Sequence, residues 1–188
     1  MVQTLRKSLQ VIKTSIIRGR IAIILLTVLF IGLIVFCTLF PIPDADKEII
    51  VNPGVVKFSK VFLHNILVFL FQEFMGISTF GLYGIFAIYI NALSLGTTFS
   101  VLYSTNKLYL VYKMVIHGTI ESCAIILNSF FSFYFWVKVF KNVKLVFLKK
   151  QKLSTALIDM CFFTASFTVL FLIMYLVAGV FEKLVSYF

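Results

Sequence analysis

Long apolar runs, separated by short polar or basic segments, make up most of this chain. Five of these runs predict transmembrane helices, with expected bounds of 21–40, 61–75, 80–103, 108–137 and 155–181. The runs are apolar on all sides, whereas a strand would alternate apolar and polar residues. At about 1.5 Å per residue, about 20 residues of helix cross the roughly 30 Å hydrocarbon core of a bilayer. We therefore expect an all-α, polytopic transmembrane helix bundle over residues 21–181.

Residues 1–20 are predicted to form an N-terminal amphipathic helix that lies in the membrane interface. Apolar residues recur there at spacings of three and four, which places them on one helical stripe: Val2, Leu5, Leu9, Ile12 and Ile16. Five basic residues and no acidic residue accompany them. A basic amphipathic helix of this kind binds the surface of an anionic leaflet. The alternative is a basic tail that only directs membrane insertion.

The second and third apolar runs are joined by a very short segment that contains Gly76, Ser78 and Gly81. Glycine and serine interrupt helical patterns, so this join predicts a tight helical hairpin. One broken helix is the alternative. The fourth run has 30 residues, so it must tilt, break near Gly118 or extend beyond the bilayer.

The basic residues are distributed unevenly, and this distribution predicts the topology. Of the 17 Lys and Arg residues, 11 lie either in residues 1–20 or in residues 138–152. Five spans put both segments on one side of the membrane, which the positive-inside rule identifies as the cytoplasmic side. Merging the second and third runs into one span would put them on opposite sides. We therefore expect a multi-pass protein of the bacterial cytoplasmic membrane with a cytoplasmic N-terminus and an external C-terminus.

Residues 138–152 are predicted to form a lysine-rich cytoplasmic loop, part of which forms a second interfacial helix. Its lysines are candidates for contact with lipid or for docking of a cytoplasmic partner: Lys138, Lys141, Lys144, Lys149, Lys150 and Lys152. The alternative is that they only set the topology. The net charge of +10 does not indicate nucleic-acid binding, because the basic residues flank apolar segments as they do at a membrane surface.

Polar residues inside the apolar runs are the candidate functional site. Ionisable residues at membrane depth are costly and usually face the bundle interior, which draws attention to His117 and Glu121. These two residues are four apart and share one helix face, and Gly118 between them would let another helix approach closely. The same spacing also fits simple packing between helices. The further candidates are His64, Asn65, Glu73, Asn91 and Gly96, the last of which forms a small-residue packing surface with Ala92.

Motifs of known catalytic chemistry are absent from the sequence. It has no metal-binding His-Glu-x-x-His or paired-cysteine spacing, no Gly-x-Ser-x-Gly turn and no phosphate-binding lysine motif. We therefore expect no metal, no cofactor and no enzymatic activity. An intramembrane peptide-processing enzyme that uses His117 and Glu121 is the weaker alternative.

Three motifs together resemble the stage II sporulation protein M family, over roughly residues 20–180. His64-Asn65 resembles the family's Asn-Asn, Asn91-Ala92-x-x-x-Gly96 its Asn-Gly-x-x-x-Gly, and His117-Gly118-x-x-Glu121 its Pro-His-Gly-x-x-Glu. The motifs occur in the same order and at similar spacing. The chain departs from them at His64, Ala92 and Ile116, where the family usually has asparagine, glycine and proline.

The resemblance implies a multi-span membrane protein without established catalytic residues, in one of two settings. One is a sporulation complex that anchors cell-wall hydrolases, and the other is a bacteriocin gene cluster in which a family member accompanies an ATP-binding protein. Our leading expectation is a non-enzymatic membrane subunit that acts with a separate ABC-type ATPase in export of, or self-protection against, a hydrophobic peptide. A sporulation-type scaffold is the alternative. A homo-oligomer fits either setting, because five small spans enclose little interior.

Overall fold

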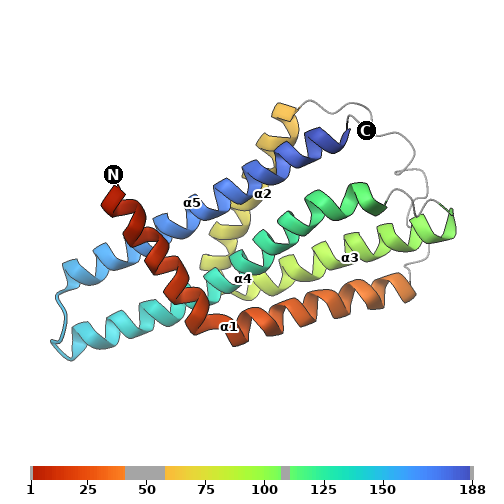
Figure 1. The fold of residues 1–188 in the computed structure, drawn as a ribbon. Helices are drawn as coiled ribbons and strands as arrows, with labels where there is room; N and C mark the ends of the chain where they lie inside the picture. Colours follow the sequence, from red (N-terminus) through yellow and green to blue (C-terminus); the bar gives the residue numbers. More distant parts are fainter. Residues whose placement is uncertain (1, 41–57, 107–110, 187–188) are drawn as a thin grey trace.

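The computed structural model describes residues 2–40, 58–106 and 111–186, with the backbone alone for residues 2, 58–62, 112–117 and 182–186. In this part of the chain the elements are α1 (Val2–Leu39), α2 (Phe58–Ser78), α3 (Leu82–Ser104), α4 (Val111–Phe147) and α5 (Leu153–Ser186). No strand occurs among these residues, so the all-α prediction is confirmed. Figure 1 shows the helices packed against one another in a bundle.

The helix α1 joins the two segments that were expected separately at 1–20 and 21–40. Its 38 residues make up about 57 Å of helix, and Figure 1 shows that this helix bends sharply between its red and its orange part. Its first part, red in Figure 1, crosses α4 and α5, and the remainder, in orange, runs beside α3. At the contact with α4, a Cβ on Gly19 would overlap the ring of Phe130, so glycine permits the close approach. In the expected apolar stripe Leu5 and Leu9 are exposed, whereas Ile12 packs against the core.

Successive helices of the bundle alternate in direction. The Asn65 side chain of α2 contacts Glu121 of α4, and further along both helices Ile77 contacts Trp136. The residue numbers rise together, so α2 and α4 run parallel. Figure 1 shows α3, α5 and the longer part of α1 running in the opposite direction.

An aromatic ladder on α5 forms the centre of the core. Its members recur every fourth residue and therefore share one helix face: Phe163, Phe167, Phe171 and Tyr175. Each is at most 4% exposed. The Phe131 ring of α4 packs on the first three, with ring centroids 5.1 to 5.9 Å apart. These aromatic contacts join α4 to α5 at the middle of the bundle.

Four helical stretches of the described chain are long and apolar enough to cross a membrane: Gln3–Leu39, Leu82–Ser104, Gly118–Phe147 and Leu153–Phe181. The corresponding apolar stretch of α2, Leu63–Ser78, is shorter. Large apolar side chains also cover the outside of the bundle, and Leu25, Phe74 and Ile158 are each more than 60% exposed. An apolar exterior of this kind is what a lipid environment requires.

A tight turn joins α2 to α3, so the prediction of a helical hairpin is confirmed. Phe80 and Gly81 have positive φ values of 56° and 90°. The N–H of Gly81 donates a 2.7 Å hydrogen bond to the carbonyl oxygen of Gly76, which closes the last turn of α2. Glycine adopts this backbone conformation without strain, and so it reverses the chain here.

The helix α4 continues past the expected end of the fourth run at 137 and reaches Phe147. The prediction of a loop over 138–152 was therefore wrong for most of its length, because only residues 148–152 lie between α4 and α5. The residues expected to form a second interfacial helix instead continue α4 as its last part. Neither glycine nor proline occurs between Gly118 and Gly179, so nothing in the sequence interrupts the helix where the lysines begin.

Candidate functional site

The packing of α2 against α4 brings together residues from two of the three motifs. Nδ2 of Asn65 donates a 3.1 Å hydrogen bond to Oε1 of Glu121. Three helical turns further on, a Cβ on Gly76 would overlap the Ser132 side chain, so the two backbones approach closely there. In each of these two pairs, the residue on α4 comes 56 positions after its partner on α2. The two parallel helices therefore keep one register between these pairs.

Glu121 also faces α5. The carboxylate lies within electrostatic reach of the Tyr175 hydroxyl, and Tyr175 is 4% exposed. Tyr175 is the last member of the aromatic ladder, and its ring centroid lies 5.5 Å from that of Phe69 on α2. Polar groups of α2, α4 and α5 thus meet at this level of the bundle.

A second carboxylate is buried two turns further along α2. Glu73 is 7% exposed, and the Thr168 hydroxyl of α5 donates a 2.6 Å hydrogen bond to its Oε1. A buried carboxylate is tolerated only where polar partners replace its hydration. The contact therefore fixes the register of α2 against α5, as the Asn65 contact does against α4.

Asn128 lies between these two contacts and has no hydrogen-bond partner for Nδ2 or Oδ1 in the described part of the chain. It is 2% exposed. The 56-residue register between α2 and α4 places Gln72 level with Asn128, and Gln72 is also buried. An unpaired buried amide costs about 1 to 3 kcal/mol, and it offers two donor hydrogens and an acceptor to a polar guest.

These side chains form one group of buried and half-buried residues, which we term the polar cluster. It comprises Asn65, Gln72, Glu73, Glu121, Asn128, Thr168 and Tyr175. Thr168 and Tyr175 carry no charge and lie in a long apolar run, so the sequence alone gives no signal for them. Only the helix register shows that they face the two glutamates.

The Asn91 motif lies at a different interface, between α3 and α1. A Cβ on Gly96 would lie 2.6 Å from Cβ of Cys37 and 2.8 Å from the carbonyl oxygen of Ile34. Ala92 is fully buried beside it, so the close packing expected at Ala92 and Gly96 is found. Nδ2 of Asn91 donates to the carbonyl oxygen of Ala87, one turn earlier in its own helix. This motif therefore holds two helices together.

The other motif positions have less defined surroundings. The backbone of His117 is part of α4, and its side chain lies outside the described residues. No described atom lies within 4 Å of the position that a Cβ on Gly118 would take, so these atoms do not supply the close approach expected there. His64 is exposed on α2. Within the described ranges, no group of three His, Cys, Asp or Glu residues could hold a metal ion.

The six candidate lysines do not form one uniform surface. Lys138 is half-buried, and its ammonium lies 4.1 Å from the centroid of the Phe163 ring. The others are exposed at the end of α4 or in the turn to α5: Lys141, Lys144, Lys149, Lys150 and Lys152. Lys138 therefore belongs to the packing between α4 and α5, and the remaining five are free to meet a partner.

Comparison with known families gives a match to Stage II sporulation protein M over residues 21–187. Neither the curated proteins nor the solved structures give a match. The matched range covers well over half of the chain and contains all three motifs. Two of these motifs meet in the hydrogen bond between Asn65 and Glu121. The chain therefore belongs to the stage II sporulation protein M family.

Proposed function

We propose that this protein is a non-enzymatic membrane subunit that works with a separate ABC-type ATPase. Its task would be to export a hydrophobic, bacteriocin-like peptide or to protect the cell against it. Family membership supports the proposal, because the family resemblance implies members that accompany an ATP-binding protein in bacteriocin gene clusters. The chain itself carries no ATP-binding motif, so energy from ATP has to come from a partner.

The proposal includes five membrane spans with a cytoplasmic N-terminus. The alternating directions of α1 to α5 support this count, since α2 runs parallel to α4 and opposite to its neighbours α1 and α3. Five crossings put residues 1–20 and the turn at 148–152 on the same side of the membrane. Both are basic, as the cytoplasmic side requires.

The observation that carries the proposed partner is the projecting end of α4 and α5, residues 138–160, which we term the α4–α5 tip. Figure 1 shows these ends reaching beyond the place where α1 crosses them. Between them lies a groove of about 610 Å³ with a mainly apolar lining that includes Val139, Val143, Phe147, Leu153 and Leu157. Phe147 is 82% exposed, which is a large apolar surface to leave in water.

Lys149 lies in the lining of this groove, and four further exposed lysines lie on the same tip. An apolar centre with a polar rim is the usual anatomy of a protein interface. Nδ2 of Asn142, in the groove lining, has no hydrogen-bond partner in the described part of the chain. A partner with an acidic rim and an apolar projection would match both features. We assign this surface to the ATPase.

The test compares two triple variants of the tagged protein, each purified in mild detergent from its native cells. Lys141→Glu, Lys144→Glu and Lys150→Glu together reverse three charges of the α4–α5 tip. Lys149 is left unchanged because its φ is 54°, so a substitution there could alter the backbone conformation as well as the charge. The matched control is Arg6→Glu, Lys13→Glu and Arg20→Glu, which reverses three exposed charges on α1.

We expect the tip variant to lose the ATP-binding partner and the control to retain it, with unchanged melting temperatures in both. Retention of the partner by the tip variant would contradict the docking surface. Recovery of cell-wall hydrolases by the unmodified protein would favour the scaffold instead. Loss of the partner from both variants would mean that net charge alone, and not the α4–α5 tip, governs association.

A further inference from the structure

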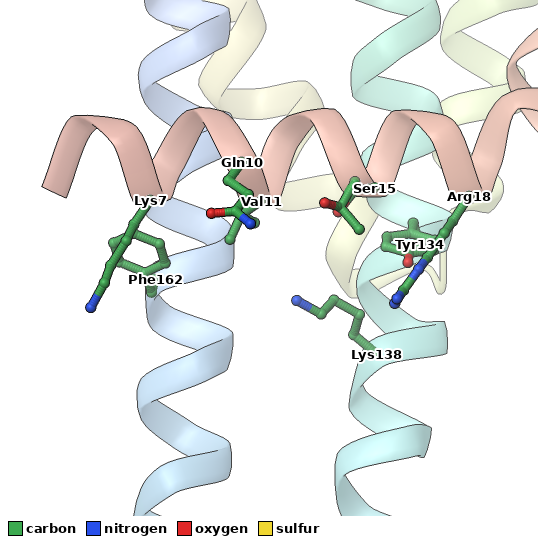
Figure 2. Close-up of a pocket in the computed structure, with 9 residues that line it drawn as sticks. Lys7, Gln10, Val11, Ser15, Arg18, Tyr134, Lys138 and Phe162 are labelled. Atoms are coloured by element: carbon green, nitrogen blue, oxygen red, sulfur yellow. The ribbon is translucent and has the colours of Figure 1, made fainter. Parts of the chain in front are cut away.

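A cavity of about 330 Å³ lies where the first part of α1 crosses α4 and α5. Nine residues line it: Lys7, Gln10, Val11, Thr14, Ser15, Arg18, Tyr134, Lys138 and Phe162. Three of these are cations, four carry a hydroxyl or amide, and none is acidic. Figure 2 shows Lys7 and Arg18 extending from α1 toward the side on which Lys138 lies. We propose that this cavity binds the phosphate group of an anionic phospholipid.

The residues around Arg18 form the phosphate end of the cavity. Arg18 and Lys138 are close enough to repel each other, and Lys141 adds to the positive potential at Lys138. Asp159 is the acidic group that acts on Lys138, and its carboxylate accepts a 3.1 Å hydrogen bond from Gln151. The cavity lining itself holds no acidic residue. Asp159, outside the lining, offsets part of the charge of Lys138, and a bound anion would offset the remainder together with the charge of Arg18.

Two further features fit a phosphate better than a carboxylate-sized anion. Ser15 is 4% exposed and lies in the lining between the two basic groups, so its hydroxyl can donate to an additional oxygen. Tyr134 provides a second hydroxyl from α4. A phosphate diester accepts several hydrogen bonds at once, and the Arg18 guanidinium is suited to bind two of its oxygens.

Lys7 marks the other end of the cavity. At 1.5 Å per residue it is about 16 Å from Arg18 along the helix axis, so one phosphate cannot touch both. Gln10 and Thr14 lie between them in the lining. This end is therefore assigned to the remaining polar part of a lipid headgroup, such as the hydroxyls of a glycerol.

The apolar side of the same helix indicates a lipid as the source of the phosphate. Leu5, Leu9 and Ile17 are exposed on α1, and each is at least 55% exposed. Arg6 and Lys13 are exposed on the same helix, and a helix that exposes apolar and basic side chains together lies where headgroups meet acyl chains. A lipid phosphate is found at that depth, whereas free phosphate stays in water. The proposed topology places this lipid in the cytoplasmic leaflet, and only that placement rests on the proposed function.

The experiment measures lipid binding by native mass spectrometry of the full chain in detergent. The probes are phosphatidylglycerol, phosphatidylcholine and inorganic phosphate. The test variant is Arg18→Gln with Lys138→Gln. The matched control is Arg20→Gln with Lys144→Gln, which removes the same two charges from exposed positions of the same helices outside the cavity.

We expect the wild type to retain phosphatidylglycerol in preference to phosphatidylcholine. The affinity of the test variant for phosphatidylglycerol should be lower by roughly tenfold or more, which is the effect expected from the loss of one charge-assisted hydrogen bond. The control should bind as the wild type does. Should the double variant lose its fold, Arg18→Gln alone, at an exposed position, is expected to weaken binding at least threefold.

Unchanged binding by the test variant, or an equal loss in the control, would overturn the site. Displacement of the lipid by millimolar inorganic phosphate would show that the cavity takes free phosphate, and would overturn the assignment to lipid.

Discussion

The amide of Asn65 donates a 3.1 Å hydrogen bond to the carboxylate of Glu121, 56 residues away in the sequence. The bond joins α2 to α4 at a level of the bundle where Tyr175 of α5 also lies within electrostatic reach of the carboxylate. Since lipid offers no competing hydrogen bonds, such a contact between half-buried side chains defines how neighbouring helices are aligned. It brings residues of two motifs that are distant in the sequence into contact.

A double-mutant cycle measures the strength of this bond. Asn65→Leu and Glu121→Leu should each destabilise the bundle, and the two changes together should cost less than their sum. The expected coupling is about 0.6 kcal/mol and at most roughly 1.7 kcal/mol, as found for hydrogen bonds between membrane helices. Unfolding in mild detergent provides the measurement. The control cycle pairs Asn65→Leu with Thr168→Val. Thr168 donates its hydrogen bond to Glu73 and not to Glu121, so the effects of these two substitutions on stability should be additive.

Gly96 tests the close packing of α3 on α1. Gly96→Ala places a Cβ 2.6 Å from Cβ of Cys37 and 2.8 Å from a backbone oxygen, so α1 must move away. We expect the free energy of unfolding to fall by about 1 to 3 kcal/mol, and the melting temperature to fall with it. Gly32→Ala is the matched control, because no described atom lies within 4 Å of its Cβ position on α1. That change should be neutral or slightly stabilising, as alanine is the better helix former. Equal effects at both glycines would refute the close contact.

Asn128→Leu is expected to stabilise the protein. The substitution replaces a buried amide that has no partner among the described residues with an apolar side chain of similar size. Removing the cost of an unpaired amide should raise stability by about 1 to 2 kcal/mol, which a thermal melt in detergent detects. A clear loss of stability would mean that a water molecule or a bound guest satisfies the amide. If the variant is more stable but no longer exports the peptide or protects the cell against it, Asn128 has a role in function.

Cysteine labelling distinguishes five spans from four. In a variant without Cys37, Cys123 and Cys161, Thr105→Cys lies at the end of α3 and Lys150→Cys lies in the turn between α4 and α5. With a cytoplasmic N-terminus and five spans, a membrane-impermeant thiol reagent added to whole cells should label residue 105 and not residue 150. If α2 does not cross the membrane, the pattern is reversed.

The general architecture was predictable because hydrophobic runs of this length have few alternatives in a membrane. The all-α class and the hairpin at Gly81 followed from run lengths and from glycine, whose positive φ of 90° reverses the chain. The end of α4 was not predictable from hydropathy. Lysines interrupt an apolar run without interrupting a helix, so the sequence pattern changes at 138 while the backbone continues to Phe147.

The candidate site was predictable only in part. Asn65, Glu73 and Glu121 stand out in the sequence because they are polar within apolar runs. Their partners depend on register between helices that are far apart in the chain, and Thr168 has no feature that marks it in advance. The cavity beside Arg18 escaped sequence reasoning for the same reason, since it exists only where α1 crosses α4 and α5.

The most direct test of the central claim is affinity purification of the tagged, unmodified protein from its native cells in mild detergent, with all co-purifying proteins identified. A membrane subunit that works with an ABC-type ATPase should recover an ATP-binding protein in stoichiometric amount. Recovery of the chain alone as a homo-oligomer, or together with cell-wall hydrolases and no ATP-binding protein, would contradict the account.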